Sequence, residues 1–169
     1  MDGKNTDNSN KTKIRNIALN GIMLALIVAL QATNLPNLLT GIIVNGIIVF
    51  ILLYIGLKSA LVIGLISPLF GFFTGHVPVF MYPVLPMIAL GNDLLVIVLH
   101  RLANSSNWLK IFLPAFIKAL VIGLGGWLLV SYFIPDKLQN FIVIGVLGIH
   151  FFTAVPGIGL GIMLSKRIK

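Results

Sequence analysis

The sequence predicts an all-α integral membrane protein, a bundle of six transmembrane helices with both termini on the cytoplasmic side. Of its 169 residues, 58% are hydrophobic and only 9% are charged, whereas about a quarter of the residues in a soluble domain are charged. The apolar residues form runs of roughly spanning length, and the basic residues gather in alternate connectors. A single domain of this size cannot hide so much apolar surface in its interior, so lipid must cover much of it.

The first ten residues, MDGKNTDNSN, have no apolar periodicity, so residues 1–12 are predicted to be a disordered cytoplasmic tail. Residues 13–169 are predicted to form one membrane domain. Its first apolar run, residues 16–33, follows three basic residues, Lys11, Lys13 and Arg15. A signal peptide begins in the same way, but this run ends in a polar turn without a clear A-x-A cleavage site. We therefore interpret it as a retained helix.

Five further apolar runs complete the bundle, at residues 38–57, 60–74, 83–99, 111–134 and 141–164. A membrane-spanning helix needs about 17–25 residues. The run at 60–74 is the shortest and contains Ser67-Pro68, so a kinked or partly inserted helix is expected there. The connectors are rich in proline, glycine and asparagine, which break helices, and none is long enough to separate two domains.

The distribution of lysine and arginine predicts the orientation. An even number of spans with the N-terminus inside leaves Lys137 as the only basic residue in an outer connector, while Lys118 lies within a run. The other ten of the twelve basic residues fall on the inner side: Lys4, Lys11, Lys13, Arg15, Lys58, Arg101, Lys110, Lys166, Arg167 and Lys169.

Enzyme signatures are missing from the sequence. It has no phosphate-binding loop, no His-Glu-x-x-His, no Gly-x-Ser-x-Gly and no cysteine. Three of its four acidic residues, Asp2, Asp7 and Asp136, lie outside the predicted spans, which leaves Asp93 alone inside. No enzyme activity, cofactor or metal site is therefore predicted. The net charge of +8 is spread over the ends of apolar runs rather than over one face, which argues against nucleic acid as a partner.

Asp93 and Lys118 are the two charged residues within the runs. A lone charge at mid-membrane is costly, so such residues usually have partners. Both lie about 10–12 Å from the predicted inner surface at ~1.5 Å rise per residue, and we expect them to form an ion pair. The pair can act as a structural clasp or as a contact for coupling or for a ligand; alternatively, Lys118 extends towards the inner surface.

Uncharged polar and aromatic residues concentrate in the predicted outer half, where they favour a pocket for a small polar molecule. An aromatic belt at the interface also explains Tyr82, and His150 can be a buried histidine bonded to a backbone carbonyl. The candidate pocket residues are Asn34, Asn45, His76, Tyr82, Trp127, Asn140 and His150.

Small residues recur at two places in the predicted helices. Gly21, Ala25 and Ala29 are four residues apart, so they share one helix face that another helix can approach closely, within this bundle or on a partner. Gly157-x-Gly159-x-Gly161 looks like a nucleotide fingerprint, but it follows no strand and lies in an apolar run. Helix packing is the better interpretation.

The chain resembles the substrate-binding (S) components of energy-coupling factor (ECF) vitamin transporters. The features that carry the resemblance are the length, the six spans, the basic start at Lys11, Lys13 and Arg15, and the stretch from Ala25 to Ala29, which matches the family's Ala-x-x-x-Ala motif. The resemblance covers nearly the whole chain after the tail. It implies a multi-pass subunit in the cytoplasmic membrane of a prokaryote that binds a vitamin or vitamin precursor from outside.

By the same resemblance, Gly21, Ala25 and Ala29 dock on a transmembrane coupling protein that is driven by two cytoplasmic ATPases. Thiamine is disfavoured as cargo because the tryptophan and acidic positions of the thiamine-type members are not found. Riboflavin, pantothenate, niacin and pyridoxine-like or pyrimidine compounds stay open. A membrane scaffold subunit and a secondary transporter are the alternatives, although the latter usually shows two related halves, and none is apparent here.

Overall fold

The structure, a computed structural model, describes residues 3–33, 35–132 and 136–168, apart from the side chains of 3–9, 80, 130 and 136–143. Within these ranges the chain is entirely helical and contains no strand, which confirms the predicted all-α class. Its elements are α1 (Gly3–Ala32), α2 (Asn37–Tyr54), α3 (Leu57–Phe73), the 3-10 helix η1 (Val79–Val84), α4 (Leu85–Arg101), α5 (Asn107–Val130) and α6 (Asp136–Ile168).

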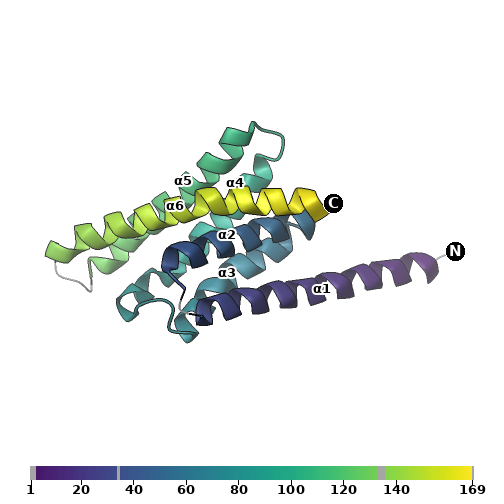
Figure 1. Ribbon diagram of the computed structural model, residues 1–169, viewed down its shortest axis with the longest axis horizontal. Coiled ribbons are helices and arrows are strands. Elements are labelled where there is room, and N and C mark those ends of the chain that lie inside the picture. Colours follow the sequence, from purple (N-terminus) through teal and green to yellow (C-terminus); the bar gives the residue numbers. More distant parts are fainter. Residues whose placement is uncertain (1–2, 34, 133–135, 169) are drawn as a thin grey trace.

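The helices run up and down the bundle, and both termini lie at the same end (Figure 1). Five helical stretches of the described chain are long and apolar enough to cross a membrane: 10–32, 37–54, 81–101, 107–129 and 144–168. Helix α3 has 17 residues, with Pro68 inside it, and is the short helix expected from the sequence. This set of helices has the lengths and composition of a multi-pass membrane protein.

The chain reverses between α2 and α3 in a tight turn at Gly56. The sequence interpretation continued the second run to Leu57, but α2 ends at Tyr54. Gly56 has a φ of 132°, which L side chains rarely adopt, so this turn depends on glycine. The turn lets α2 and α3 pack side by side as antiparallel neighbours.

The N-terminal segment differs from the prediction. Residues 1–12 were expected to be a disordered tail, but α1 begins at Gly3. Once the apolar part of a helix has formed, each additional residue adds one backbone hydrogen bond without a new nucleation step. The polar residues from Gly3 to Thr12 therefore continue the helix that the apolar run begins.

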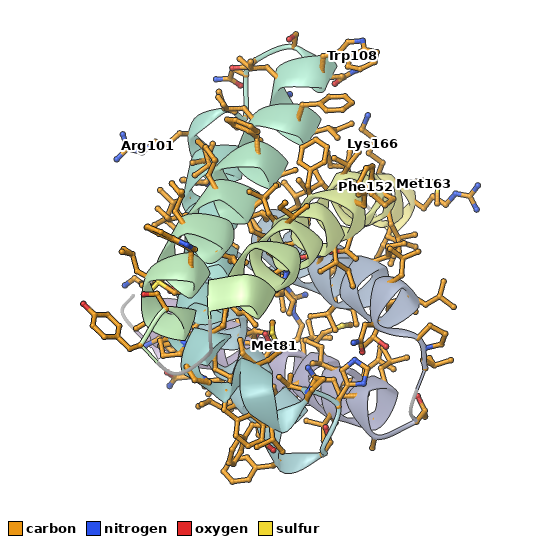
Figure 2. All side chains as sticks on the ribbon, turned by 90° about the vertical axis from the view of Figure 1, so that its left-hand side faces the viewer. Met81, Arg101, Trp108, Phe152, Met163 and Lys166 are labelled. Carbon is orange, nitrogen blue, oxygen red and sulfur yellow. The ribbon has the colours of Figure 1, made fainter. Side chains whose placement is uncertain are left out.

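The core surrounds α2, and α1 lies at the edge of the bundle. Half of the apolar stretch of α2 is buried, against 11% of that of α1. Ile48, Val49 and Ile51 of α2 are nearly inaccessible to solvent. Large apolar side chains are exposed on all six helices, among them Trp108, Phe152 and Met163 (Figure 2). An apolar exterior of this kind matches the lipid-facing surface of a membrane bundle.

Helices α2 and α6 approach closely at two glycines. A Cβ atom on Gly157 would lie 2.6 Å from the Cβ of Asn45, and one on Gly161 would lie 2.6 Å from the carbonyl oxygen of Gly46. Gly159, between them, has nothing within 4 Å of its Cβ position. The interpretation of this stretch as a helix-packing motif is confirmed for Gly157 and Gly161, which bring the two backbones together.

These contacts predict a difference between neighbouring glycines. Gly157→Ala and Gly161→Ala should each lower the free energy of unfolding by about 1–3 kcal/mol, because the added methyl meets backbone atoms that cannot move aside. Gly159→Ala is the matched control and should leave stability unchanged or raise it slightly, since alanine is the better helix former. Unfolding in detergent micelles, followed by circular dichroism, measures all three. Equal losses in the three variants would contradict the packing.

Candidate functional site

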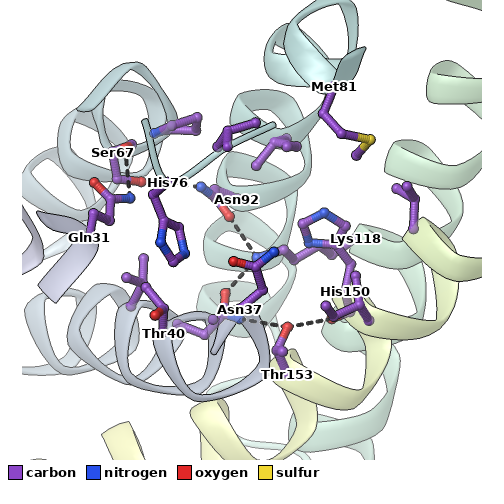
Figure 3. A pocket seen from close by; sticks show the side chains of 18 of the residues that line it. Gln31, Asn37, Thr40, Ser67, His76, Met81, Asn92, Lys118, His150 and Thr153 are labelled. Carbon is purple, nitrogen blue, oxygen red and sulfur yellow. Dashed lines mark hydrogen bonds between the residues drawn. The ribbon is translucent and has the colours of Figure 1, made fainter. Parts of the chain in front are cut away.

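A cavity of about 370 Å³ lies between the helices, towards the end of the bundle opposite the termini. Figure 3 shows its lining side chains. It is bounded by the end of α1, the start of α2, the second half of α3, the loop before η1, and parts of α4, α5 and α6. Its lining residues are Gln31, Asn37, Thr40, Gly41, Val44, Asn45, Ser67, Pro68, His76, Val77, Pro78, Met81, Ile88, Asn92, Lys118, Gly145, Val146, Ile149, His150 and Thr153.

Lys118 of α5 is the charged group of this lining. Its side chain is only 2% exposed. The ammonium donates hydrogen bonds to Asn45 Oδ1 of α2 at 2.5 Å and to Asn92 Oδ1 of α4 at 2.6 Å (Figure 3). Both distances are at the short end for nitrogen and oxygen, as charge-assisted bonds are. Amide oxygens from two helices thus hold a buried cation between them.

A close approach of α4 and α5 positions this contact. A Cβ atom on Gly91 would lie 2.7 Å from Ile122 Cγ1 and 3.3 Å from Lys118 Cγ. Only a residue without a side chain lets the two helices come so near. The next residue of α4, Asn92, is thereby brought within hydrogen-bond reach of the ammonium.

The two asparagines extend the network to further helices. Asn92 Nδ2 donates to the carbonyl oxygen of Gly64 in α3 at 2.9 Å. Asn45 Nδ2 donates to Thr153 Oγ1 of α6 at 3.4 Å. Separately, Gln31 Nε2 of α1 donates to the carbonyl oxygen of Ser67 in α3 at 3.2 Å (Figure 3). All six helices therefore contribute a polar group to the cavity wall or to the bonds behind it.

The predicted ion pair between Asp93 and Lys118 is wrong. Lys118 bonds to the two asparagines, and Asp93 Oδ1 is buried without a hydrogen-bond partner. A Cβ atom on Gly64 would lie 2.9 Å from that oxygen, so the carboxylate lies against α3. Successive residues of a helix point about 100° apart, which turns Asp93 away from α5 when Asn92 faces it. Asp93 and Lys118 were expected at the same depth in the membrane, but Asp93 lies on a face of α4 that does not point towards α5.

Some of the predicted pocket residues line the cavity and others do not. Asn45, His76 and His150 line the cavity. Tyr82 is not among the lining residues and packs on Phe72, with ring centroids 4.4 Å apart, while Trp127 is 44% exposed. Asn34 and the side chain of Asn140 lie outside the described residues.

Sequence reasoning missed Asn92 and Thr153. Asn92 is 4% exposed and Thr153 is 2% exposed, and both lie in apolar helices. The signal for Asn92 was present, because a side-chain amide in an apolar run needs a partner much as a charge does. Threonine gives no comparable signal, since its hydroxyl can bond to its own helix, as that of Thr153 does to the carbonyl oxygen of His150.

The rest of the described lining is neutral. Its amides and hydroxyls carry no charge, and no aspartate or glutamate is among the lining residues. Burial lowers the pKa of His76 from its usual 6.5, which favours the uncharged form of the imidazole in this loop. Val44, Ile88, Val146 and Ile149 add apolar walls. Such a cavity can hold a small molecule by one cation, several hydrogen bonds and apolar contact.

The small residues of α1 lie on the outside of the bundle. Gly21, Ala25 and Ala29 are exposed, whereas Ile27 and Gln31 of the same helix are buried against it. The sequence left open whether this face packs within the bundle or against a partner. Because all three residues are exposed, packing within the bundle is excluded. It is available to another molecule or to lipid.

The hydrogen bonds of Lys118 predict which neighbours stabilise the bundle. Asn92→Leu should lower the free energy of unfolding by about 1–3 kcal/mol, because it leaves a buried ammonium donor unsatisfied. Asp93→Asn, one residue away, is the control and should cost little, since its buried Oδ1 has no bond to lose. A double-mutant cycle with Lys118→Met should give a coupling energy with Asn92→Leu and none with Asp93→Asn. A coupling energy with Asp93→Asn and none with Asn92→Leu would instead support an ion pair between Asp93 and Lys118.

Comparisons with known proteins return no relative of this chain. No family model matches it, and neither a curated protein nor a solved structure matches it. Its function is therefore argued from the cavity and from the helices that build it.

Proposed function

We propose that the chain is a membrane-embedded binding subunit that captures a vitamin or vitamin precursor for uptake, in the manner of the S component of an ECF transporter. The observation that carries the proposal is the cavity of about 370 Å³ between the helices, with its buried Lys118 and surrounding amides. Ligand sites of small molecules are concavities of roughly 300–1,000 Å³, mostly apolar with a few placed polar groups.

The position of the cavity supports a role in binding from one side of the membrane. Its lining comes from the ends of helices opposite both termini, together with the loop before η1. In the proposed topology six helices cross the cytoplasmic membrane of a prokaryotic cell, with both termini inside, as the lysine and arginine distribution favours. The cavity then faces outward, where a scarce nutrient has to be captured.

The exposed face of α1 supports a partner. Gly21, Ala25 and Ala29 are exposed, and such a face allows close helix-to-helix contact. We assign it to docking on a transmembrane coupling protein that works with two ATPases. The chain has no phosphate-binding loop of its own, so an energised uptake cycle needs partners of this kind.

The network around Lys118 favours this proposal over a membrane scaffold. A scaffold needs complementary outer surfaces but no cavity. Polar groups buried in an apolar bundle cost free energy unless they are hydrogen-bonded, and those that face a cavity are typical of functional sites. This chain brings amides and a cation from different helices, and an imidazole from the loop before η1, to one cavity.

The first test is a search for bound cargo. The chain is purified gently in detergent, and small molecules released on unfolding are identified by mass spectrometry. We expect a vitamin-like compound in near-stoichiometric amount, because a site that combines a buried cation, amides and apolar walls retains a matching ligand. An Asn45→Leu variant, altered in the cavity wall, should carry less of it. Protein that binds nothing, with no thermal stabilisation by a panel of vitamins, would favour the scaffold.

The second test separates docking from binding. Ala25→Trp together with Ala29→Trp should abolish uptake in cells while leaving ligand affinity unchanged, because the bulky rings keep a second helix away from the side of α1 that faces away from the cavity. Leu26→Trp is the control: Leu26 is exposed on the same helix at 46% and is already large. Uptake and ligand affinity are measured for each variant. Normal uptake in the double variant would exclude this face as the docking site.

A further inference from the structure

The cation in the cavity wall has no counter-ion among the described residues. Lys118 contacts two neutral amides, and the nearby Asp93 turns towards α3 instead. The other acidic residues of the sequence, Asp2, Asp7 and Asp136, are not among the side chains that the structure describes. A charge buried in an apolar bundle without an opposite charge is unfavourable. A negative group that enters the cavity would therefore offset a cost that the two amide oxygens reduce but do not remove.

The ammonium of Lys118 has bonding capacity left. It carries three N–H donors, of which two are used by Asn45 and Asn92. The side chain is held at its tip by amides from two different helices, so it cannot extend towards either membrane surface without breaking both bonds. The third donor and the whole positive charge remain for a group that enters the cavity.

The other walls limit the size and charge of that group. No aspartate or glutamate is among the described lining residues, so no carboxylate of that part of the wall repels a negative charge. A phosphate ester carries about −1.5 to −2 charges and three strong acceptor oxygens, more than one ammonium and neutral amides can neutralise. A carboxylate carries a single charge and matches one ammonium. The apolar side chains of Val44, Ile88, Val146 and Ile149 suit a body of carbon rather than a small inorganic ion.

We infer that the cavity binds a small organic carboxylate with a single negative charge and a largely apolar body, whose carboxylate group is held by Lys118. The inference rests on the proposed binding function and narrows its substrate class. Asn45 and Asn92 orient the ammonium. The carboxylate neutralises its positive charge and accepts its third hydrogen bond. Neutral and cationic compounds of similar size would leave that charge unpaired and bind less tightly.

A charge-based fractionation tests the inference before the cargo is known. The small-molecule fraction of yeast extract is passed over an anion exchanger at pH 7, which separates retained anions from neutral and cationic compounds. The unmodified, washed chain in lipid nanodiscs is mixed with each fraction, and its unfolding temperature is recorded. The bound compound is then identified by mass spectrometry. We expect a higher unfolding temperature with the retained fraction only, and a carboxylate among the molecules bound.

Two variants assign the effect to Lys118. Lys118→Gln keeps an N–H donor for the asparagines but removes the charge, whereas Lys118→Met removes both. If Lys118→Met does not fold, Lys118→Gln still tests the role of the charge. Each should bind the carboxylate about 10- to 100-fold more weakly, as the loss of a buried charge contact does. Asp93→Asn, which changes charge outside the lining, is the control and should retain full affinity. The amide of the identified acid should bind the unmodified chain as weakly as the acid binds Lys118→Gln.

The outcomes separate this inference from the proposed function. Stabilisation by the neutral and cationic fraction alone would overturn the carboxylate assignment while supporting a binding subunit. The same would follow if Lys118→Gln folded and bound the acid with unchanged affinity. Stabilisation by neither fraction would overturn the binding function, and the carboxylate inference with it.

Discussion

The ammonium of Lys118 is the group on which the arrangement of the bundle depends. It joins α5 to α2 through Asn45 and to α4 through Asn92, and the amide nitrogens of those two residues reach α6 and α3. In a water-soluble protein a lysine at this position would extend to the surface. In an apolar bundle its charge must be solvated by the protein itself, so the neighbouring helices take the positions that bring amide oxygens to it.

The cavity lies next to the same polar network. Lys118, Asn45, Asn92 and Thr153 of the network are all lining residues, and a space of about 370 Å³ is an exception to the close packing of protein interiors. Glycines then decide where the backbones touch: Gly91 brings α4 to α5, and Gly157 and Gly161 bring α6 to α2. The cavity lies beside these contacts, because Asn45, against which Gly157 packs, is one of its lining residues.

Helix α1 has a different relation to the bundle. Two side-chain hydrogen bonds attach it to α3, from Asn20 to Ser59 and from Gln31 to the backbone of Ser67, while most of its apolar surface is left open. A helix attached by one narrow face offers the remainder to lipid or to a partner. The cavity, which Gln31 lines, and the proposed docking face therefore lie on opposite sides of this helix.

The sequence by itself determined the helical class, the positions of the apolar helices, the short third helix and the role of the glycine motif in α6, because hydrophobic run length and breaker residues act locally. It also identified Lys118 as a residue that needs a partner. Only the tertiary structure decided that the partner is Asn92 with Asn45 rather than Asp93, and that Tyr82 and Trp127 stay out of the cavity. Depth along a helix can be counted from residue numbers, but the direction in which a side chain points depends on how each helix is rotated against its neighbours, and that rotation is fixed by contacts between residues far apart in the chain.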